Sequence, residues 1–325
     1  MRTKLEFMSD RIEAVLAQRQ MPARVTGGTV TPRWVRFQVL PAVGAKISKI
    51  KELSEELAAA LNVPTCRVSR RGAAVAVEIP RDDPQPVRLL PLYRQLDTIP
   101  RVTATLGLAE DGAPLLIRLP SPDVGHVLVT GDSGAGKTTL LQTMILSLAM
   151  ANPVSDLNFV LVDLKGRSFQ PFAGLPHLAR PVIEDAGEAA EAVRSLTRLM
   201  EQRNSNGHNT HATTVLVIDE LSYLHPPAIN VLNRLAQRGH QAGIHIIAAT
   251  QSPSLLPGFR LVGKTANATG ARAAAGLDKT RAERLMGRGD FLAVAEGRVT
   301  RFQVAYVSPD EIKNTVEEVQ RGPTR

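Results

Sequence analysis

The chain has 325 residues, a formal net charge of +8, 43% hydrophobic residues and a single cysteine, Cys66. This composition is typical of a folded protein with one large or two medium domains, and it excludes a disordered chain, an internal disulfide and a cysteine-rich zinc site. The excess of Lys and Arg favours a polyanionic partner such as nucleic acid. No apolar run approaches the roughly 18 residues of a membrane span, and the charged amino terminus is unlike a signal peptide. We therefore expect a cytoplasmic protein without membrane insertion.

Residues 1–80 have the pattern of a small α+β domain. Apolar residues lie at helical spacing over 10–17 and 48–61, and they alternate as in half-buried strands over 34–39 and 75–79. A proline-rich stretch follows. Because proline stiffens a chain and interrupts regular structure, we predict a linker over residues 81–100.

Residues 101–310 have a different pattern, in which short apolar strands alternate with helices. The expected strands are 126–131, 157–163, 213–219 and 243–250. The expected helices are 137–151, 185–204 and 226–241. Such alternation indicates an α/β fold with a parallel sheet that is covered on both faces. A closing hairpin is expected over 291–307 with its turn at Glu296-Gly297, followed by a short helix and tail over 311–325.

The strongest motif is GDSGAGKT, Gly131 to Thr138, which fits the phosphate-binding P-loop pattern. Its glycines let backbone N–H groups wrap the phosphates of a nucleotide, and the helix that follows adds the positive end of its dipole. Lys137 is expected to reach the β- and γ-phosphates of ATP, and Thr138 to ligate Mg²⁺. A glycine-rich turn that binds nothing is the alternative, but the motif follows an apolar strand and opens a helix. The predicted nucleotide-binding residues are Gly131, Ser133, Gly134, Ala135, Gly136, Lys137, Thr138 and Thr139.

A second element is the apolar segment VLVIDE, which ends in Asp219 and Glu220. Buried carboxylates are costly unless they have partners, so a buried strand that ends in two of them indicates a site. We expect Asp219 to bind Mg²⁺ and Glu220 to act as the general base towards water. Capping of a helix is the alternative role for the pair. Gln251, just after the strand 243–250, is expected to sense the γ-phosphate, or else to satisfy a loop backbone.

These motifs occur in order with the segments VDLKG (162–166), PHLARPVIED (176–185), AGIHIIAATQSPS (242–254) and RLMGRGDFL (284–292). Together they closely resemble the motor of the FtsK/SpoIIIE DNA translocases, within the HerA/FtsK superfamily of hexameric ring ATPases. The segment before them resembles the small α domain of that family. The resemblance implies a RecA-like motor domain, a homohexameric ring that threads double-stranded DNA, and a nucleotide between subunits that a basic residue of the neighbour completes. We expect a short soluble form without the membrane helices or the winged-helix domain of the family.

The chain departs from the family at its trans-acting arginine. Where the family has that arginine, just before AGIH, this chain has His240. Arg238 lies two residues earlier and Arg234 lies a further helical turn back, and either could replace the missing arginine. Our hypothesis is that Arg238 is the catalytic arginine finger, because it is the arginine of that helix nearest to the family position.

The segments that would face DNA are short in this chain but contain basic residues. Movement along any sequence needs contacts to the DNA backbone without reading of bases, which suits Lys and Arg on loops. Each such residue is otherwise part of an ordinary solvated surface. The predicted DNA-binding residues are Arg260, Lys264, Arg272, Lys279 and Arg281.

The leading functional hypothesis is an ATP-dependent double-stranded DNA translocase. Two alternatives stay open: a coupling ATPase of a secretion or conjugation machine, and a nucleotide-gated DNA-binding protein with weak turnover. Among the histidines, His177 and His245 are expected to pack or to form hydrogen bonds. His208 and His211 have a spacing that is only weakly indicative of a metal site.

Overall fold

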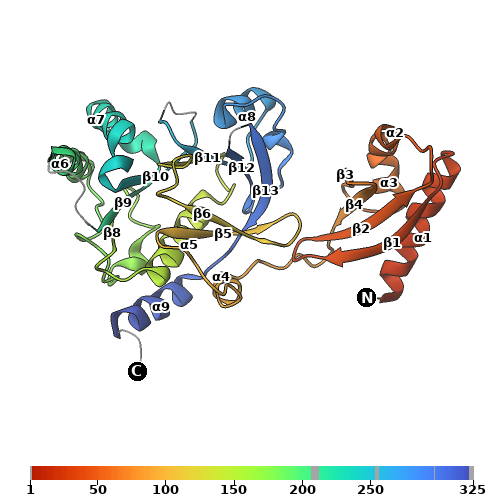
Figure 1. The fold of residues 1–325 in the computed structure, drawn as a ribbon, viewed down its shortest axis with the longest axis horizontal. Coiled ribbons are helices and arrows are strands. Elements are labelled where there is room, and N and C mark those ends of the chain that lie inside the picture. The colour runs from red at the N-terminus through yellow and green to blue at the C-terminus, as the bar shows by residue number, and fades with distance from the viewer. Residues whose placement is uncertain (1, 206–211, 253–255, 296, 322–325) are drawn as a thin grey trace. The chain divides into compact units, whose positions relative to one another are not determined.

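The computed structural model describes residues 2–205, 212–252, 256–295 and 297–321 (Figure 1). The chain divides into two compact units, one that ends at Pro86 and one that begins at Val87. Each unit has its own hydrophobic core. The predicted turn residue Glu296 and the histidines 208 and 211 lie outside the described residues.

The first unit is a four-stranded antiparallel sheet of order β1-β2-β4-β3 with helices packed on one face. Its elements are α1 (Arg2–Gln18), β1 (Ala23–Val30), β2 (Trp34–Pro41), α2 (Ile47–Glu52), α3 (Ser54–Ala60), β3 (Arg67–Arg71) and β4 (Ala74–Pro80). Alternation along β2 and β4 places Val39 and Val77 in a core with Ile12 of α1 and Leu57 of α3. The helix predicted over 48–61 is two helices, which meet at Leu53, a residue that is itself buried in this core.

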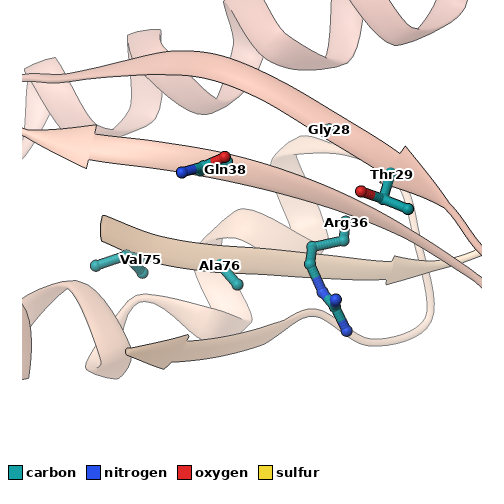
Figure 2. Close-up of a pocket in the computed structure, with 6 residues that line it drawn as sticks. All are labelled: Gly28, Thr29, Arg36, Gln38, Val75 and Ala76. Atoms are coloured by element: carbon teal, nitrogen blue, oxygen red, sulfur yellow. The ribbon is translucent and has the colours of Figure 1, made fainter. Parts of the chain in front are cut away.

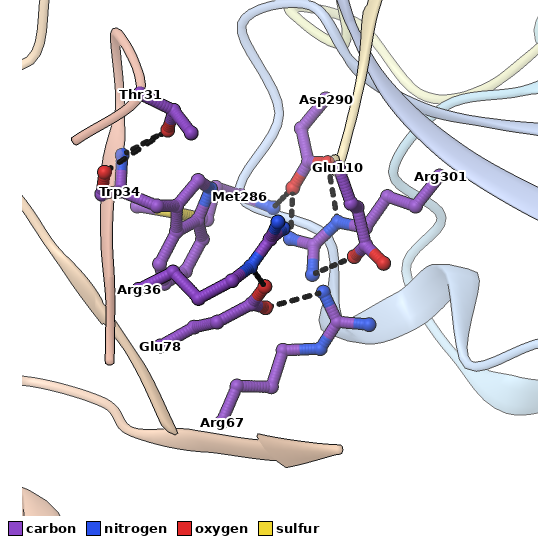
Figure 3. A network of polar contacts seen from close by, with 9 residues as sticks. All are labelled: Thr31, Trp34, Arg36, Arg67, Glu78, Glu110, Met286, Asp290 and Arg301. Atoms are coloured by element: carbon purple, nitrogen blue, oxygen red, sulfur yellow. Dashed lines mark hydrogen bonds and ion pairs between the residues drawn. The ribbon is translucent and has the colours of Figure 1, made fainter. Parts of the chain in front are cut away.

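A hollow of about 290 Å³ lies over the strands of this sheet, and Figure 2 shows the residues that line it. Its lining consists of Gly28, Thr29, Arg36, Gln38, Val75 and Ala76. The one charged side chain in the lining, Arg36, donates to Glu78 over 2.6 Å, and Arg67 lies 3.8 Å from the same carboxylate (Figure 3). The charge of this arginine is therefore compensated within its own sheet.

The second unit is built on a nine-stranded sheet of order β6-β5-β13-β12-β11-β7-β10-β9-β8. The strands from β11 to β8 are parallel, and those from β6 to β12 are antiparallel, so the predicted parallel core is confirmed and carries an antiparallel extension. The strands are β5 (Thr103–Ala109), β6 (Pro114–Arg118), β7 (Val127–Thr130), β8 (Leu157–Val162), β9 (Thr213–Asp219), β10 (Ile244–Thr250), β11 (Phe259–Val262), β12 (Asp290–Ala295) and β13 (Arg298–Val304).

Helices cover both faces of this sheet (Figure 1). They are α4 (Leu89–Tyr93), α5 (Lys137–Ala151), α6 (Ala186–Ser205), α7 (Pro226–Arg238), α8 (Ala268–Ala275) and α9 (Pro309–Arg321). Alternate residues of β9 point to opposite layers: Val217 packs in the core with α5, and Ile218 in the core with α6 and α7. This two-sided burial explains why the strand reads as a continuous apolar run.

Two segments that we expected to lie outside the motor contribute to its core. Part of the proline-rich stretch forms α4, whose Leu89 and Leu92 are buried in the same core as α5. The carboxyl-terminal helix α9 likewise buries Ile312 and Val316 there. From residue 87 onward, the proline-rich stretch that we predicted to be a linker therefore forms a short helix and its flanking residues. Within the described residues, the helices are too short or too polar to cross a membrane.

Candidate nucleotide-binding site

The P-loop connects β7 to α5 at the carboxyl edge of the parallel strands. Gly134 and Gly136 have φ values of +77° and +105°, which side chains rarely adopt. A Cβ atom on Gly136 would lie 2.7 Å from the backbone nitrogen of Gly289. At Gly136, glycine is therefore required both by conformation and by space.

Lys137 lies buried at the centre of the loop. Its Nζ donates to the carbonyl oxygens of Gly131 over 2.8 Å and Asp132 over 3.1 Å. Burial lowers the pKa of this lysine, although the nearby charges of Glu220 and Asp219 act in the opposite direction. A desolvated ammonium group at the start of a helix is suited to bind an anion such as a phosphate.

Thr138 and Asp219 converge where a divalent cation would bind. The Thr138 hydroxyl donates to Oδ2 of Asp219 over 3.0 Å, and Asp219 is 6% exposed. A hydroxyl and a carboxylate are hard oxygen donors, which Mg²⁺ prefers, and Mg²⁺ typically takes its remaining ligands from phosphate and water. Across the described residues, no group of three His, Cys, Asp or Glu side chains could hold a metal by itself. The pair therefore fits Mg²⁺ bound together with a nucleotide.

Glu220 adopts an unusual backbone conformation, φ +87° and ψ +94°, directly after β9. Its Oε1 accepts hydrogen bonds from the Ser222 hydroxyl over 2.8 Å and from the backbone N–H of Gln251 over 3.3 Å. Burial acts to raise the pKa of Glu220, but these bonds, another from Thr250 and the charge of Lys137 lower it below its usual value. The carboxylate is thus kept ionised, as a general base requires.

Gln251 does reach this site, and it contacts Glu220 through its backbone. Its N–H group bonds to Glu220, and the residue is exposed. The sensor role predicted for the Gln251 side chain remains a prediction.

Two turns to which the sequence assigned no role also contact the site, and the first of them packs against the P-loop. The N–H groups of Arg288 and Gly289 donate to the carbonyls of Gly134 over 3.1 Å and Ala135 over 2.7 Å. Asp290, which accepts from Arg301 and from the backbone of Met286, fixes this turn at the start of β12 (Figure 3). Gly287 and Gly289 in the segment RLMGRGD indicate such a turn in the sequence, because the close approach of two backbones requires glycine.

The second turn follows β8 and carries Ser168. The Ser168 hydroxyl donates to Oδ2 of Asp219 over 2.5 Å. The motif VDLKG marks the segment, but nothing in its spacing singles out this serine.

Arg238 lies at the end of α7, close to where β10 begins and therefore at the opposite edge of the sheet from the P-loop. The neighbouring His240 packs against Gly125, and its ring lies 6.3 Å from that of His126, just before β7. Arg238 is exposed. The structure therefore does not bring Arg238 to the site of its own subunit.

The predicted DNA-binding residues fall into different environments. Arg260 donates to the carbonyl of Ala274 over 3.0 Å and so fixes the end of α8. Lys264 lies beside the P-loop, because its carbonyl accepts from the N–H of Asp132 over 2.8 Å. Arg272, Lys279 and Arg281 are exposed on α8 and the turn after it, with Arg272 paired to Asp278 over 3.0 Å. Only these last three lie together on one exposed segment.

The two histidines that we expected to pack or to form hydrogen bonds do so. His177 is buried with Nε2 2.8 Å from the carbonyl of Asn152, and His245 has Nδ1 2.6 Å from the carbonyl of Gly125. Both rings therefore serve packing and hydrogen bonding.

Comparison with known proteins finds similarity to FtsK and SpoIIIE proteins along nearly the whole chain. The FtsK alpha domain matches residues 1–81, and the FtsK/SpoIIIE family matches residues 97–223. The chain is 31% identical to the DNA translocase FtsK of Chlamydia trachomatis serovar D over 95% of its own length and 44% of that protein. It is 28% identical to the DNA translocase SpoIIIE of Bacillus subtilis over 95% of its length and 45% of that protein. The chain thus spans less than half the length of these relatives.

Solved structures share the fold at lower identity. The monomer form of the pCW3 conjugation coupling protein TcpA, with ATPγS, superposes with a TM-score of 0.62 at 16% identity and covers 96% of this chain and 99% of TcpA. The cytoplasmic domain of the Thermomonospora curvata secretion ATPase EccC gives 0.61 at 23% identity, over 72% of this chain and 34% of EccC. At these identities the likeness establishes the fold alone.

Proposed function

Because this chain belongs to the FtsK/SpoIIIE family, we propose that it is an ATP-hydrolysing motor that moves double-stranded DNA. One observation supports this function above the others: Lys137, Thr138, Asp219 and Glu220, distant in sequence, meet at the carboxyl edge of the parallel strands. The curated relatives, named as DNA translocases, support DNA as the substrate. ATP with Mg²⁺ is the proposed cofactor, and the cytoplasm, where both are available, the proposed location.

In the proposed mechanism the P-loop backbone and Lys137 bind and orient the phosphates of ATP. Mg²⁺, when bound by Thr138 and Asp219, would supply neutralisation of the charge that develops on the transferred phosphoryl group. Glu220 takes a proton from the attacking water at its carboxylate, and its position is fixed by Ser222 and by the backbone of Gln251. Each of these roles belongs to a group that the fold already orients.

A ring of six subunits is the proposed assembly, with each nucleotide at a subunit boundary. Arg238 lies at the edge of the sheet away from its own P-loop, so it is proposed to act on the nucleotide of a neighbouring subunit. DNA would be contacted through phosphates by Arg272, Lys279 and Arg281, which share one exposed segment. The contact of the Arg260 guanidinium with the carbonyl of Ala274 favours a supporting role for Arg260, whereas the side chain of Lys264 is exposed and is proposed as a further phosphate contact.

The proposal is tested by measuring ATP hydrolysis without nucleic acid, with single-stranded DNA and with double-stranded DNA, beside the variant Lys137→Ala. Stimulation by duplex DNA that the variant loses is the expected result. A rate of ATP hydrolysis that is unchanged by DNA would favour a coupling ATPase of a secretion or conjugation machine. Nucleotide binding without hydrolysis, DNA present or absent, would favour a nucleotide-gated DNA-binding protein.

A further inference from the structure

A buried carboxylate organises the turn that follows β8. Asp163 is fully buried, and its Oδ2 accepts hydrogen bonds from the backbone N–H groups of Ser168 over 2.6 Å and Phe169 over 3.1 Å. Its Oδ1 accepts from the N–H of Lys165 over 3.3 Å. A buried carboxylate is tolerated when it is satisfied in this way. Asp163 therefore fixes the turn through its backbone, and its two oxygens are already engaged.

The turn places Ser168 against Asp219. Ser168 is 7% exposed, and its carbonyl accepts from Nε2 of Gln142, on the helix that follows the P-loop, over 2.7 Å. Its hydroxyl donates to Oδ2 of Asp219 over 2.5 Å. Ser168 is thus fixed by the β8 turn on one side and by α5 on the other, while its hydroxyl reaches the end of β9.

We propose that Ser168 is a positioning residue for the metal site: its hydroxyl orients the Asp219 carboxylate so that Asp219 and Thr138 can bind a divalent cation together. This inference rests on the proposed nucleotide site. Oδ2 of Asp219 receives both hydroxyls, since Thr138 also donates to it over 3.0 Å. When a cation is bound, the Thr138 oxygen would also be its ligand. Ser168 is held by the turn after β8 and by α5, so its hydroxyl can keep its hydrogen bond to the Asp219 carboxylate.

The expected size of the effect follows from the role of such partners in other metal sites. Groups that hydrogen-bond to ligating carboxylates usually change metal affinity by about 10- to 100-fold when they are removed. Ser168→Ala removes the hydroxyl but keeps the backbone bonds to Asp163 and Gln142. It should therefore weaken the cation site and leave the phosphate-binding backbone intact.

The experiment measures Mn²⁺ binding by electron paramagnetic resonance in the presence of ADP, and nucleotide binding in the presence of EDTA by fluorescence. Ser168→Ala is expected to raise the Kd for Mn²⁺ by roughly tenfold or more, with metal-free ADP affinity unchanged. Ser168→Thr retains a hydroxyl and should keep most of the wild-type affinity for Mn²⁺. Ser195→Ala is the matched control, because its hydroxyl contacts Glu191 and Arg198 on α6.

Equal Mn²⁺ affinity of Ser168→Ala and the wild-type protein, with normal ADP binding, would overturn this inference and leave the proposed function intact. Loss of ADP binding in EDTA would also overturn it, since Ser168 would then be supporting the P-loop itself. A wild-type protein that binds no nucleotide under any condition would refute the proposed function, and the inference with it.

Discussion

The hydroxyl of Thr138 donates a hydrogen bond to Asp219 over 3.0 Å, although 81 positions separate the two residues in the chain. Thr138 follows β7, Asp219 ends β9, and β10 lies between these strands in the sheet. Because the strands are parallel, their carboxyl ends meet at one edge, and groups that the chain presents separately form one site there. At the same edge of the sheet, Glu220 contacts the backbone of Gln251, the first residue after β10.

Replacing Glu220 by Gln is expected to lower ATP turnover by about 10²- to 10⁴-fold, the usual contribution of a general base. Nucleotide affinity should persist, because Lys137 and the P-loop backbone are untouched. The measurement is steady-state hydrolysis beside equilibrium nucleotide binding. Glu188→Gln, at an exposed position in the first turn of α6, is the control. Full turnover by Glu220→Gln would assign the base to another group.

Gly289→Ala tests whether the turn before β12 supports the P-loop. Gly289 has φ +87°, and its N–H donates to the carbonyl of Ala135. Gly297, at φ +76°, has open space around its Cβ position among the described residues, so Gly297→Ala carries a similar backbone cost of about 1–2 kcal/mol without touching the loop. Both variants should lose thermal stability.

Only Gly289→Ala is expected to weaken nucleotide binding, by about tenfold, which corresponds to about 1.4 kcal/mol. Isothermal calorimetry with ADP gives the affinity, and thermal unfolding gives the stability loss, which should be larger for Gly289→Ala because its Cβ would also lie 2.7 Å from Nε2 of Gln303 and 3.3 Å from Cβ of Val304. If both variants bind ADP equally well, the turn serves the fold and not the P-loop.

Arg260→Ala and Arg281→Ala should separate structural from DNA-contacting arginines. Arg260 bonds to the carbonyl of Ala274, so its loss should lower the free energy of unfolding by about 1 kcal/mol or more. Arg281 is exposed, and its loss should leave stability unchanged. Arg281→Ala should instead weaken DNA binding and make the salt dependence of log K shallower by about one unit, as for a lost phosphate contact. Unchanged salt dependence would remove Arg281 from the DNA interface.

Arg238→Ala is expected to bind ATP normally but to lose DNA-stimulated hydrolysis, because Arg238 lies at the edge of the sheet away from its own P-loop. Arg234→Ala tests the other candidate arginine, which lies one helical turn back and is paired with Glu201 over 3.4 Å, and this variant is expected to keep DNA-stimulated hydrolysis. Mixing the Arg238→Ala and Lys137→Ala proteins should restore part of the activity. At some subunit boundaries of the mixed ring, the intact P-loop of an Arg238→Ala subunit would then face the intact Arg238 of a Lys137→Ala subunit. Full activity of Arg238→Ala alone would show that the finger lies elsewhere.

The buried His126 is expected to make the second unit sensitive to acid. Burial, with the charges of His245 and His240, lowers the pKa of His126 from 6.5 to about 4, and its Nδ1 accepts from the backbone N–H of Ile246 over 3.0 Å. Because the folded-state pKa is the lower one, the unfolded chain binds the proton first. The stability is therefore complete above pH 6.5 and is lost as the pH falls towards 4.

Between pH 7 and pH 5 this histidine should reduce the free energy of unfolding by on the order of 2 kcal/mol. Denaturant titration at several pH values measures the slope. His126→Gln should flatten it, whereas His225→Gln, at an exposed position before α7, should not. Identical slopes for the wild-type protein and His126→Gln would assign the acid sensitivity to other groups.

Much of the motor could be predicted from the sequence because its signals are local. A P-loop requires glycines at fixed positions, so Gly134 and Gly136 identify it wherever the chain folds. Strands buried on both faces must be continuously apolar, so β8, β9 and β10 stand out to within a residue or two. The candidate site residues could be chosen because Asp219 ends such a strand, Glu220 follows it, and Lys137 comes at the end of the glycine-rich loop.

Only the tertiary structure could decide which polar groups meet across the sheet. Ser168 reaches Asp219 because Asp163 and Gln142 fix its turn, and Arg260 caps α8 while Arg281 stays exposed. A serine or an arginine has the same identity in either setting, and its role depends on partners that are distant in the chain. The sequence by itself therefore determined the strands, the P-loop and the two carboxylates, because local sterics and burial require particular residue types there. The partners of the remaining polar side chains depend on the packing of distant elements, which no local pattern encodes.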